Sequence, residues 1–584
     1  MQASGGPSGG TTERVSRRGR LGLLLIKPSH YDDDGYVIQW RSAFIVANSL
    51  AVVDGIIADA AQRLVLGPDV QVESRRIDEV CEILQPAKLM RWLDGFDRSA
   101  VLMTGVQSSQ FPRALDVAKQ FTAAGYQVVV GGFHVSGSLA MVPDWTPAFE
   151  GVAEAGVSLY AGELEPGIDE LLRDIFDGTL KPLYNYLGST TDLATAPNQV
   201  LMHDLAARTV EGYYGVEVGR GCPFVCSFCT IINFHGRTLR PRTPEAIERY
   251  LRQWADAGGK TILVTDDNFA RSPIWREVLE IFARLRREDP RRRWDIWIQV
   301  DALATRISGF VEACRRAGVT RLFVGLESVR ADNLAAAAKG QNKVHQLRDM
   351  IVTWKRAGIM VYAGYIVGLP NDTPARLAEE IRELQEVYPI DFLTVFLLTP
   401  LPGSEDHKKL VAAGTAMDLD LNRYDSTHVT TAHPLMTRQE VQDLYWRCWS
   451  DYFSLRHLKT VLGRALYHGL PMDIVRSTFV CTRTIAMLER MHTGDSGALR
   501  IKDRRSRRAG YPVEPMVPHF CRRFASNTWI VALTGVWLAY AYLVELALRL
   551  EKRRNGLAHY ACELTPVEET RRARAGEAST VAAE

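Results

Sequence analysis

The stretch Gly219-Arg220-Gly221-Cys222-Pro223-Phe224-Val225-Cys226-Ser227-Phe228-Cys229 contains three cysteines within eight residues. It directly follows an apolar strand candidate at Tyr214–Val218, so the thiols are expected on a loop at the carboxyl end of a strand. Cysteine thiolates are the usual ligands of iron–sulfur clusters, and close spacing lets one loop bind several irons. A four-iron cubane held by Cys222, Cys226 and Cys229 would keep one iron open, as catalytic zinc sites keep an open position.

Zinc binding and three unrelated thiols are the alternatives to a cluster. Zinc prefers four ligands, commonly arranged as two CxxC pairs, and the sequence contains no second CxxC. The remaining cysteines have no paired spacing, so we expect neither a second cluster nor a disulfide framework from them. They are Cys81, Cys314, Cys448, Cys481, Cys521 and Cys562.

Five further strand candidates follow the cysteine loop, and helical stretches separate them. Six parallel strands with intervening helices predict a partial (β/α)6 barrel over residues 208–433, with its functional groups at the carboxyl ends of the strands. With Tyr214–Val218, the candidates are Thr261–Thr265, Asp295–Val300, Arg321–Leu326, Met360–Val367 and Phe392–Leu398.

An α/β pattern also precedes the loop. Apolar strand candidates alternate with amphipathic helices such as Pro112–Ala124 and Pro166–Asp177, which predicts a Rossmann-like parallel sheet over residues 21–186. A polar linker is expected at 187–207. The strand candidates are Leu21–Ile26, Val70–Ser74, Val101–Val106, Gln127–Val130 and Val157–Ala161.

The C-terminal part, residues 434–560, is predicted to be helical, whereas residues 1–20 and 561–584 have the small, charged composition of disordered segments. Trp529–Val544 is an uncharged, mostly apolar helix candidate, shorter than the roughly 20 residues of a membrane span. We expect a buried or interfacial helix there. Its basic flanks leave peripheral membrane contact open.

Composition narrows the protein class further. The 584 residues carry a net charge of only +2, which gives no electrostatic reason to expect a nucleic-acid partner. Nine cysteines in a chain of this length do not form a disulfide framework, which fits a reducing compartment. We therefore expect a cytoplasmic protein, with association at a membrane surface as an open alternative.

The cysteine loop resembles the signature of the radical S-adenosylmethionine (SAM) superfamily, CxxxCxΦC, with Phe228 at the aromatic position. The resemblance implies a [4Fe-4S] cluster whose open iron binds SAM, Phe228 against the adenine, and reductive SAM cleavage to a 5′-deoxyadenosyl radical. It also implies SAM contacts at successive strand ends, although polar loops and helix caps use the same residue types. The residues are Asp266, Asn268, Gln299, Asp301, Glu327, Ser328 and Gly368.

A Rossmann-like domain ahead of such a barrel resembles the cobalamin-binding class of this superfamily. The resemblance implies cobalamin contacts from the loops after three strands. The DxHxxG motif that supplies a histidine ligand to cobalt is absent, so His134 is interpreted as a loop contact or an ordinary surface histidine. A domain kept for substrate or partner docking is the alternative. The implied residues are Gln107, Ser108, Ser109, Gly131, Gly132, His134, Gly162 and Glu163.

The resemblance implies methylation of an unactivated carbon, with SAM as both oxidant and methyl source. Rearrangement, cyclisation or oxidation with the same cofactors is the nearest alternative, and a non-catalytic cobalamin or cluster sensor is a remote one. An external one-electron reductant of the flavodoxin or ferredoxin type is implied. The substrate is a small molecule, a lipid or a peptide, and the sequence does not choose among them.

Overall fold

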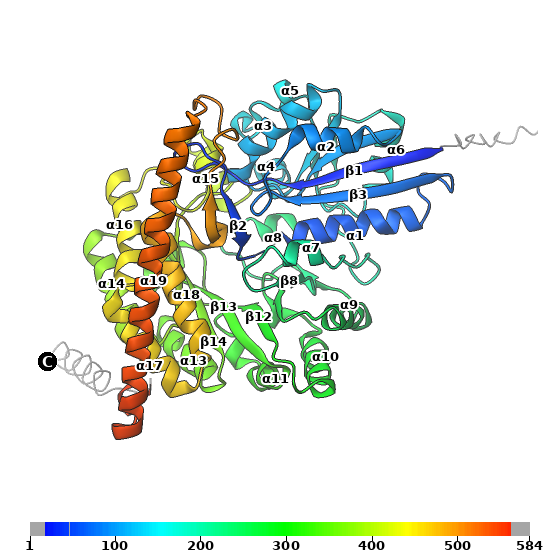
Figure 1. Ribbon diagram of the computed structural model, residues 1–584. Coiled ribbons are helices and arrows are strands. Elements are labelled where there is room, and N and C mark those ends of the chain that lie inside the picture. The colour runs from blue at the N-terminus through cyan, green and yellow to red at the C-terminus, as the bar shows by residue number, and fades with distance from the viewer. Residues whose placement is uncertain (1–17, 46, 562–584) are drawn as a thin grey trace, which may run out of the picture.

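The computed structural model describes residues 18–45 and 47–561 and begins with an entirely parallel six-stranded sheet. Its order is β3-β1-β4-β5-β6-β7, which makes it the Rossmann-like layer (blue to cyan in Figure 1). Gly19 and Arg20 already belong to its first strand, so the predicted disordered lead is too long; its residues 1–17 lie outside the described chain. The strands are β1 (Gly19–Lys27), β3 (Val70–Asp78), β4 (Arg98–Met103), β5 (Gln127–Gly131), β6 (Ser158–Ala161) and β7 (Leu183–Asn185).

Helices cover both faces of this sheet because its strands are apolar on both sides. Side chains of α1 (Asn48–Gln62) and α6 (Ile168–Asp177) form a core with one face. Those of α2 (Pro86–Leu93) and α3 (Phe111–Thr122) form a core with the other. Two further helices, α4 (Phe133–Met141) and α5 (Val152–Ala155), complete this layer.

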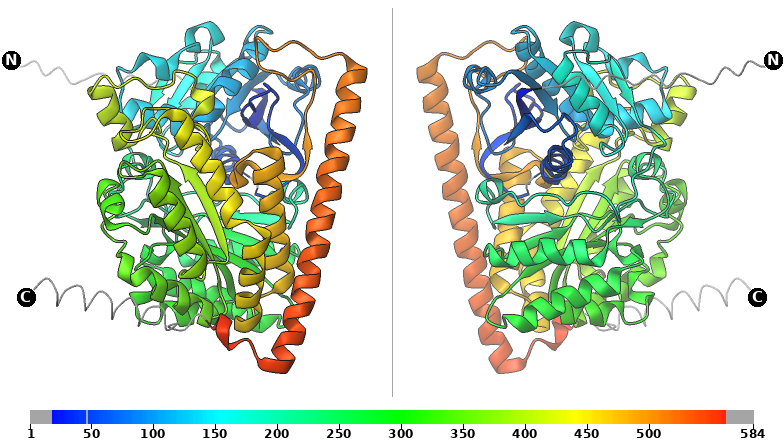
Figure 2. Two further views of the ribbon diagram at one scale, coloured as in Figure 1. Left: turned by 90° about the vertical axis from the view of Figure 1, so that its left-hand side faces the viewer. Right: turned by 90° about the vertical axis from the view of Figure 1, so that its right-hand side faces the viewer.

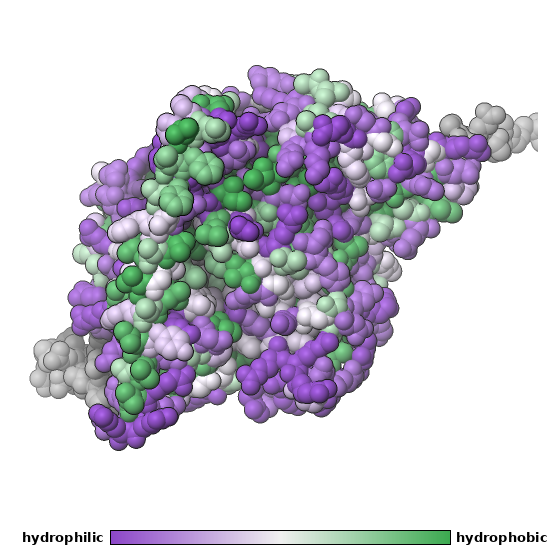
Figure 3. Space-filling view, viewed as in Figure 1, coloured by the Kyte–Doolittle hydropathy of each residue, from purple (hydrophilic) through white to green (hydrophobic). Residues whose placement is uncertain are grey.

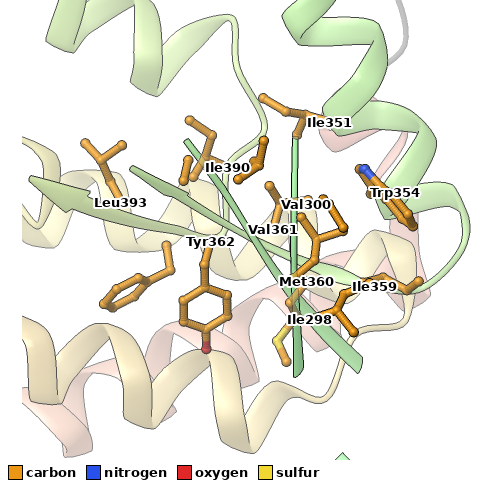
Figure 4. Close-up of a cluster of buried hydrophobic side chains, with 14 of the residues drawn as sticks. Ile298, Val300, Ile351, Trp354, Ile359, Met360, Val361, Tyr362, Ile390 and Leu393 are labelled. Carbon is orange, nitrogen blue, oxygen red and sulfur yellow. The ribbon is translucent and has the colours of Figure 1, made fainter. Parts of the chain in front are cut away.

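The second sheet is the partial barrel, with all strands parallel in the order β15-β14-β13-β12-β11-β8. Its core packs strand residues such as Ile298 and Val361 against Ile351 and Trp354 of α13 (Val344–Arg356) (Figure 4). The predicted fold class is thus confirmed. The strands are β8 (Tyr213–Val216), β11 (Thr261–Val264), β12 (Asp295–Val300), β13 (Val319–Glu327), β14 (Met360–Val367) and β15 (Phe392–Leu397).

The barrel helices lie between these strands in the chain. Thr243 and Thr373 cap two of them, each accepting a hydrogen bond from the backbone N–H three residues on. The helices are α9 (Pro244–Asp256), α10 (Trp275–Glu288), α11 (Phe310–Ala317), α13 and α14 (Pro374–Glu386).

The C-terminal part is helical as predicted and consists mainly of α16 (Arg438–Tyr452), α17 (Leu455–His468), α18 (Met472–Thr484) and α19 (Met516–Asn555). These helices lie side by side along the barrel (Figure 2). The sequence did not predict β16 (Gly497–Ile501), which pairs antiparallel with β2 (Gln39–Ala43) and ties the C-terminal part to the first domain. No local pattern could reveal a partner so far away in the chain.

The length predicted for the last helix is wrong. The apolar stretch Trp529–Val544 is only the middle of the 40-residue α19, and the expectation of a buried helix fails because its outer side chains are exposed. Of the tail predicted at 561–584, residues 562–584 lie outside the described chain.

Candidate active site

The cysteine loop is held at its base by a short two-stranded ribbon. β9 (Gly219–Arg220) pairs antiparallel with β10 (Arg240–Pro241), and the backbone N–H of Cys222 donates to Gly236 O at 3.3 Å. Gly221 has a φ of +99°, and a Cβ there would lie 2.5 Å from Thr238 O. Glycine before the first cysteine is therefore required by the turn itself.

The three thiols are free and only partly exposed. Burial raises the pKa of Cys222 and raises that of Cys229 to about 11, so these two thiols keep their protons until a metal binds. Among the described residues, no three His, Cys, Asp or Glu side chains are grouped tightly enough for a single ion. A cubane does not require such a group, because each thiolate binds a different iron. Three thiols on one loop without a fourth protein ligand fit a four-iron cluster.

Lys339 adds positive charge beside the thiols. Its ammonium is buried, forms an ion pair with Glu327 and lies 5.7 Å from the ring centroid of Phe228. Gln341 Nε2 donates to Cys226 Sγ at 3.4 Å. The sequence analysis missed Lys339 and Gln341, since nothing in the chain around them marks them. Glu327 has a φ of +64°, a strained backbone conformation that aims its carboxylate at Lys339.

The predicted SAM contacts after β11 touch the cysteine loop directly. Asp266 accepts hydrogen bonds from the backbone N–H groups of Val218 and Gly219, at 2.8 and 3.0 Å. Asn268 hydrogen-bonds the Cys222 thiol and donates to Asp301 at 3.1 Å. Asp266 Oδ2 and Asn268 Oδ1 are buried without a protein partner. These two atoms are unpaired polar groups beside the cluster loop, as is expected where a polar ligand binds.

The other predicted SAM residues are more dispersed. Asp301 is bound by Arg271 through two hydrogen bonds of 2.7 Å, and the Ser328 hydroxyl donates to Glu380 at 3.1 Å. The side chains of Asp301 and Ser328 thus make contacts within the protein. Gln299 is half-buried at the end of β12. Gly368, with a φ of +91°, lines a separate cavity of about 300 Å³ at the ends of β14 and β15.

A cleft of about 310 Å³ lies where the carboxyl ends of the two sheets meet. The first domain contributes four of the predicted cobalamin residues, and the barrel contributes Glu217, Arg220 and Asp267. Burial raises the pKa of Asp267 to about 7. The sequence did not identify these three barrel residues, although Arg220 lies just before the cysteine signature. The four predicted residues are Gly131, Gly132, Gly162 and Glu163.

The other four predicted cobalamin residues are not among the side chains that line this cleft. His134 is 1% exposed, so its interpretation as a surface histidine is wrong. Its ring nitrogens lie 3.1 Å from Ser108 Oγ and 2.7 Å from Ala148 O, which leaves neither nitrogen free for a ligand. Ser109 is buried, and the backbone of Gln107 is hydrogen-bonded to Gln110.

The structure gives a different reason for glycine at two positions of the cleft than the close approach of a cofactor. A Cβ on Gly132 would lie 2.1 Å from Val106 N, and a Cβ on Gly162 would lie 2.6 Å from the backbone of Tyr186. Both residues have positive φ, of +141° and +105°. The protein's own loops therefore require glycine at these positions, whatever binds in the cleft.

Buried ion pairs join the two domains at the base of the cysteine loop. Arg220 contacts Glu163 and Glu165 of the first domain and Glu217 of the barrel. Arg240 also binds Glu163, while Arg242 binds Glu217. Although burial opposes ionisation, the bonds from Arg240 and the charge of Arg220 lower the pKa of Glu163 to about 2. Glu163 therefore stays charged and, with Arg220 and Arg240, fixes the loop against the first domain.

Comparison with known proteins agrees with this geometry. The model of the radical SAM superfamily matches residues 216–384, which contain the cysteine loop and β11 to β14. Bacteriochlorophyllide d C-8(2)-methyltransferase of Chlorobaculum tepidum is 25% identical over 63% of this chain and 80% of its own length. Hopanoid C-2 methylase of Rhodopseudomonas palustris is 27% identical over 57% of this chain and 61% of its own.

A solved structure extends the likeness in fold beyond the barrel. The cobalamin-dependent SAM radical enzyme OxsB, with aqua-cobalamin and SAM bound, has a TM-score of 0.54 at 12% identity, covering 94% of this chain and 83% of that one. At this identity the likeness concerns the fold alone. The family model, the complete cysteine signature and the parallel barrel that carries it together show that residues 216–384 of this chain match the radical SAM superfamily.

Proposed function

We propose that the protein is a cobalamin-dependent radical SAM enzyme that methylates an unactivated carbon. One observation carries the proposal: a single cleft is lined by the strand-end loops of the first domain and by residues flanking the cysteine loop of the barrel. A corrin held by the first loops would therefore face the cluster side of the same cavity. The methyltransferase names of the two curated relatives support methyl transfer as the reaction.

The two cofactors would be held by different parts of the chain. Cys222, Cys226 and Cys229 would hold the cluster, while the loops at Gly132 and Gly162 would cradle cobalamin. When bound, the cluster with SAM supplies hydrogen-atom abstraction and the cobalamin supplies the methyl group. The protein's part is to fix these groups across the cleft and to exclude water from it. Lys339 offsets negative charge on the thiolates.

The decisive experiment uses the full chain, reconstituted anaerobically with iron and sulfide and supplied with hydroxocobalamin, SAM and dithionite. We expect both S-adenosylhomocysteine and 5′-deoxyadenosine. Deoxyadenosine without S-adenosylhomocysteine would refute the methylase function and favour rearrangement, cyclisation or oxidation. The triple variant Cys222→Ala/Cys226→Ala/Cys229→Ala should lose the bound iron, whereas the exposed Cys521→Ala should keep it.

Superfamily members need a substrate and a reductant, and we propose a flavodoxin or ferredoxin as the electron donor. We also propose a reducing, cytoplasmic location for the catalytic domains. The eight cysteines that the structure describes, all of them free thiols, support it.

A further inference from the structure

The outer surface of α19 is apolar where a soluble protein would be polar. Large apolar side chains project from it along its whole length (Figure 3). Phe520, Phe524 and Leu543 are 72%, 71% and 66% exposed. The other exposed members of this face, which we call the outer face, are Met516, Val517, Trp529, Val531, Val536, Tyr540, Tyr542, Leu546 and Leu550.

The inner side of α19 carries the polar contacts instead. Glu545 is 5% exposed and binds Arg476 of α18, and the hydroxyls of Thr534 and Thr484 lie 2.9 Å apart. Lys552 Nζ donates to Leu466 O of α17 at 2.8 Å. These bonds hold the helix against α17 and α18 (Figures 1 and 2). α19 is thus apolar on its outer side as well as on its inner side, where Ala541 and Leu548 join the core, unlike a surface helix that faces water.

Residues 524–544 contain no charged side chain. At 1.5 Å per residue they extend about 31 Å, close to the thickness of the hydrocarbon core of a bilayer. α19 is also the one helix among the described residues that is long and apolar enough to cross a membrane, and only 11% of its most apolar window is buried. It therefore cannot be explained as the core helix of a soluble domain, nor does it lie near the N-terminus as a signal sequence would.

Basic side chains flank the uncharged segment at both ends. Arg522 and Arg523 precede it, and Arg549, Lys552, Arg553 and Arg554 follow it, so basic residues outnumber acidic ones at each end. Two copies of α19 packed together, parallel or antiparallel, would bring positive ends into contact. Anionic lipid headgroups complement these ends, and acyl chains complement the face between them.

We propose that α19 attaches the protein to an anionic lipid bilayer, lying in the plane of one leaflet with its outer face inserted. The helix does not cross the membrane, because its inner side is bonded to α17 and α18 at Thr534, Glu545 and Lys552. Crossing would break these contacts and expose the buried Glu545 carboxylate to lipid, at a cost of several kcal/mol. This attachment is independent of the reaction proposed above.

Flotation of the purified full chain with vesicles tests the attachment. We expect strong binding to phosphatidylcholine vesicles that contain phosphatidylglycerol and weaker binding to pure phosphatidylcholine. Phe524→Asp/Val531→Asp/Leu543→Asp should weaken binding at least tenfold. The matched control is Val210→Asp/Leu419→Asp/Leu435→Asp, at side chains 47%, 62% and 59% exposed elsewhere, and it should bind as the parent does. Bound iron and melting temperature confirm that both variants are folded.

A parent chain that fails to float with either vesicle, or an outer-face variant that floats as well as the control, would overturn the proposal. So would a dimer, measured by sedimentation equilibrium, that dissociates in the outer-face variant and does not float. Arg553→Gln and Arg554→Gln, both exposed, should each lower the preference for anionic vesicles about fivefold.

Cysteine labelling separates an in-plane helix from a spanning one. In a Cys521→Ser background, Val513→Cys places a thiol just before α19, at a side chain that is 58% exposed, and Asn555→Cys places a second thiol at the other end. With protein bound to sealed vesicles, a membrane-impermeant maleimide should label both positions from outside, as read by peptide mass spectrometry. Protection of one end until the vesicles are lysed would show a spanning helix and refute the in-plane arrangement.

Discussion

Replacing Arg220 with methionine tests the idea that buried charge holds the cysteine loop against the first domain. The Arg220 side chain is 7% exposed and lies 2.7 Å from Glu165, 2.8 Å from Glu217 and 3.5 Å from Glu163. Removing one partner of a buried ion pair costs about 3–5 kcal/mol, because the other charge remains buried and unpaired.

The lower part of this range applies here. Arg240 still neutralises Glu163, and Arg242 still neutralises Glu217. Glu165, 9% exposed, would lose its arginine and keep only a hydrogen bond of 3.3 Å from the Thr191 hydroxyl. We therefore expect Arg220→Met to reduce the free energy of unfolding by about 3 kcal/mol. Adding Glu165→Gln should restore about 1–2 kcal/mol, since it removes the stranded charge.

Urea unfolding of the apoprotein, followed by circular dichroism, measures these changes in the free energy of unfolding. The iron bound per chain after reconstitution measures how well the cysteine loop still holds a cluster. Arg220 directly precedes the cysteine turn, so iron loading should fall as well. The control is Arg252→Met, which removes an exposed arginine from Glu248 and Glu288 and should change the free energy of unfolding far less, because solvent screens exposed ion pairs. The reasoning is refuted if Arg220→Met costs no more than this control, or if Glu165→Gln does not compensate.

Three further changes probe other parts of the chain. Gly132→Ala should lower the melting temperature and prevent cobalamin retention, because its Cβ would lie 2.1 Å from Val106 N. The control is Gly178→Ala, which also has a positive φ but no atom within 4 Å of its Cβ, so it measures the cost of the backbone conformation alone. Although burial opposes protonation, Asp33 and Asp425 raise the pKa of His428 to about 10. Protonation of His428 therefore stabilises the fold fully below about pH 6.5, and we expect the free energy of unfolding to fall by about 2 kcal/mol as the pH rises toward 10. His428→Gln should not show this fall. An equal fall in both proteins would contradict the assignment. Thr437→Ala removes the hydroxyl that accepts from the Glu440 backbone at the start of α16 and should cost about 1 kcal/mol in urea unfolding, whereas Thr437→Ser should cost little.

The sequence alone determined the features that depend on neighbouring residues. β12 and β14 begin and end where their apolar runs predict, since a buried parallel strand is apolar on both faces and its limits are visible in composition. The proposed cluster ligands were equally accessible from the sequence, because three thiols on one loop form a contiguous motif. The same contiguity made Phe228 identifiable.

Only the tertiary structure decided which groups meet across the chain. His134 looked available on its glycine loop, yet Ser108 and Ala148 occupy both its nitrogens. Lys339 pairs with Glu327, and Arg220 pairs with Glu165, only because folding brings these carboxylates next to them. Composition marked α19 as apolar but could not show which side faces outward, because exposure depends on where α17 and α18 lie. The effect of a charge or an apolar surface depends on its distance in space to other groups, and folding sets that distance.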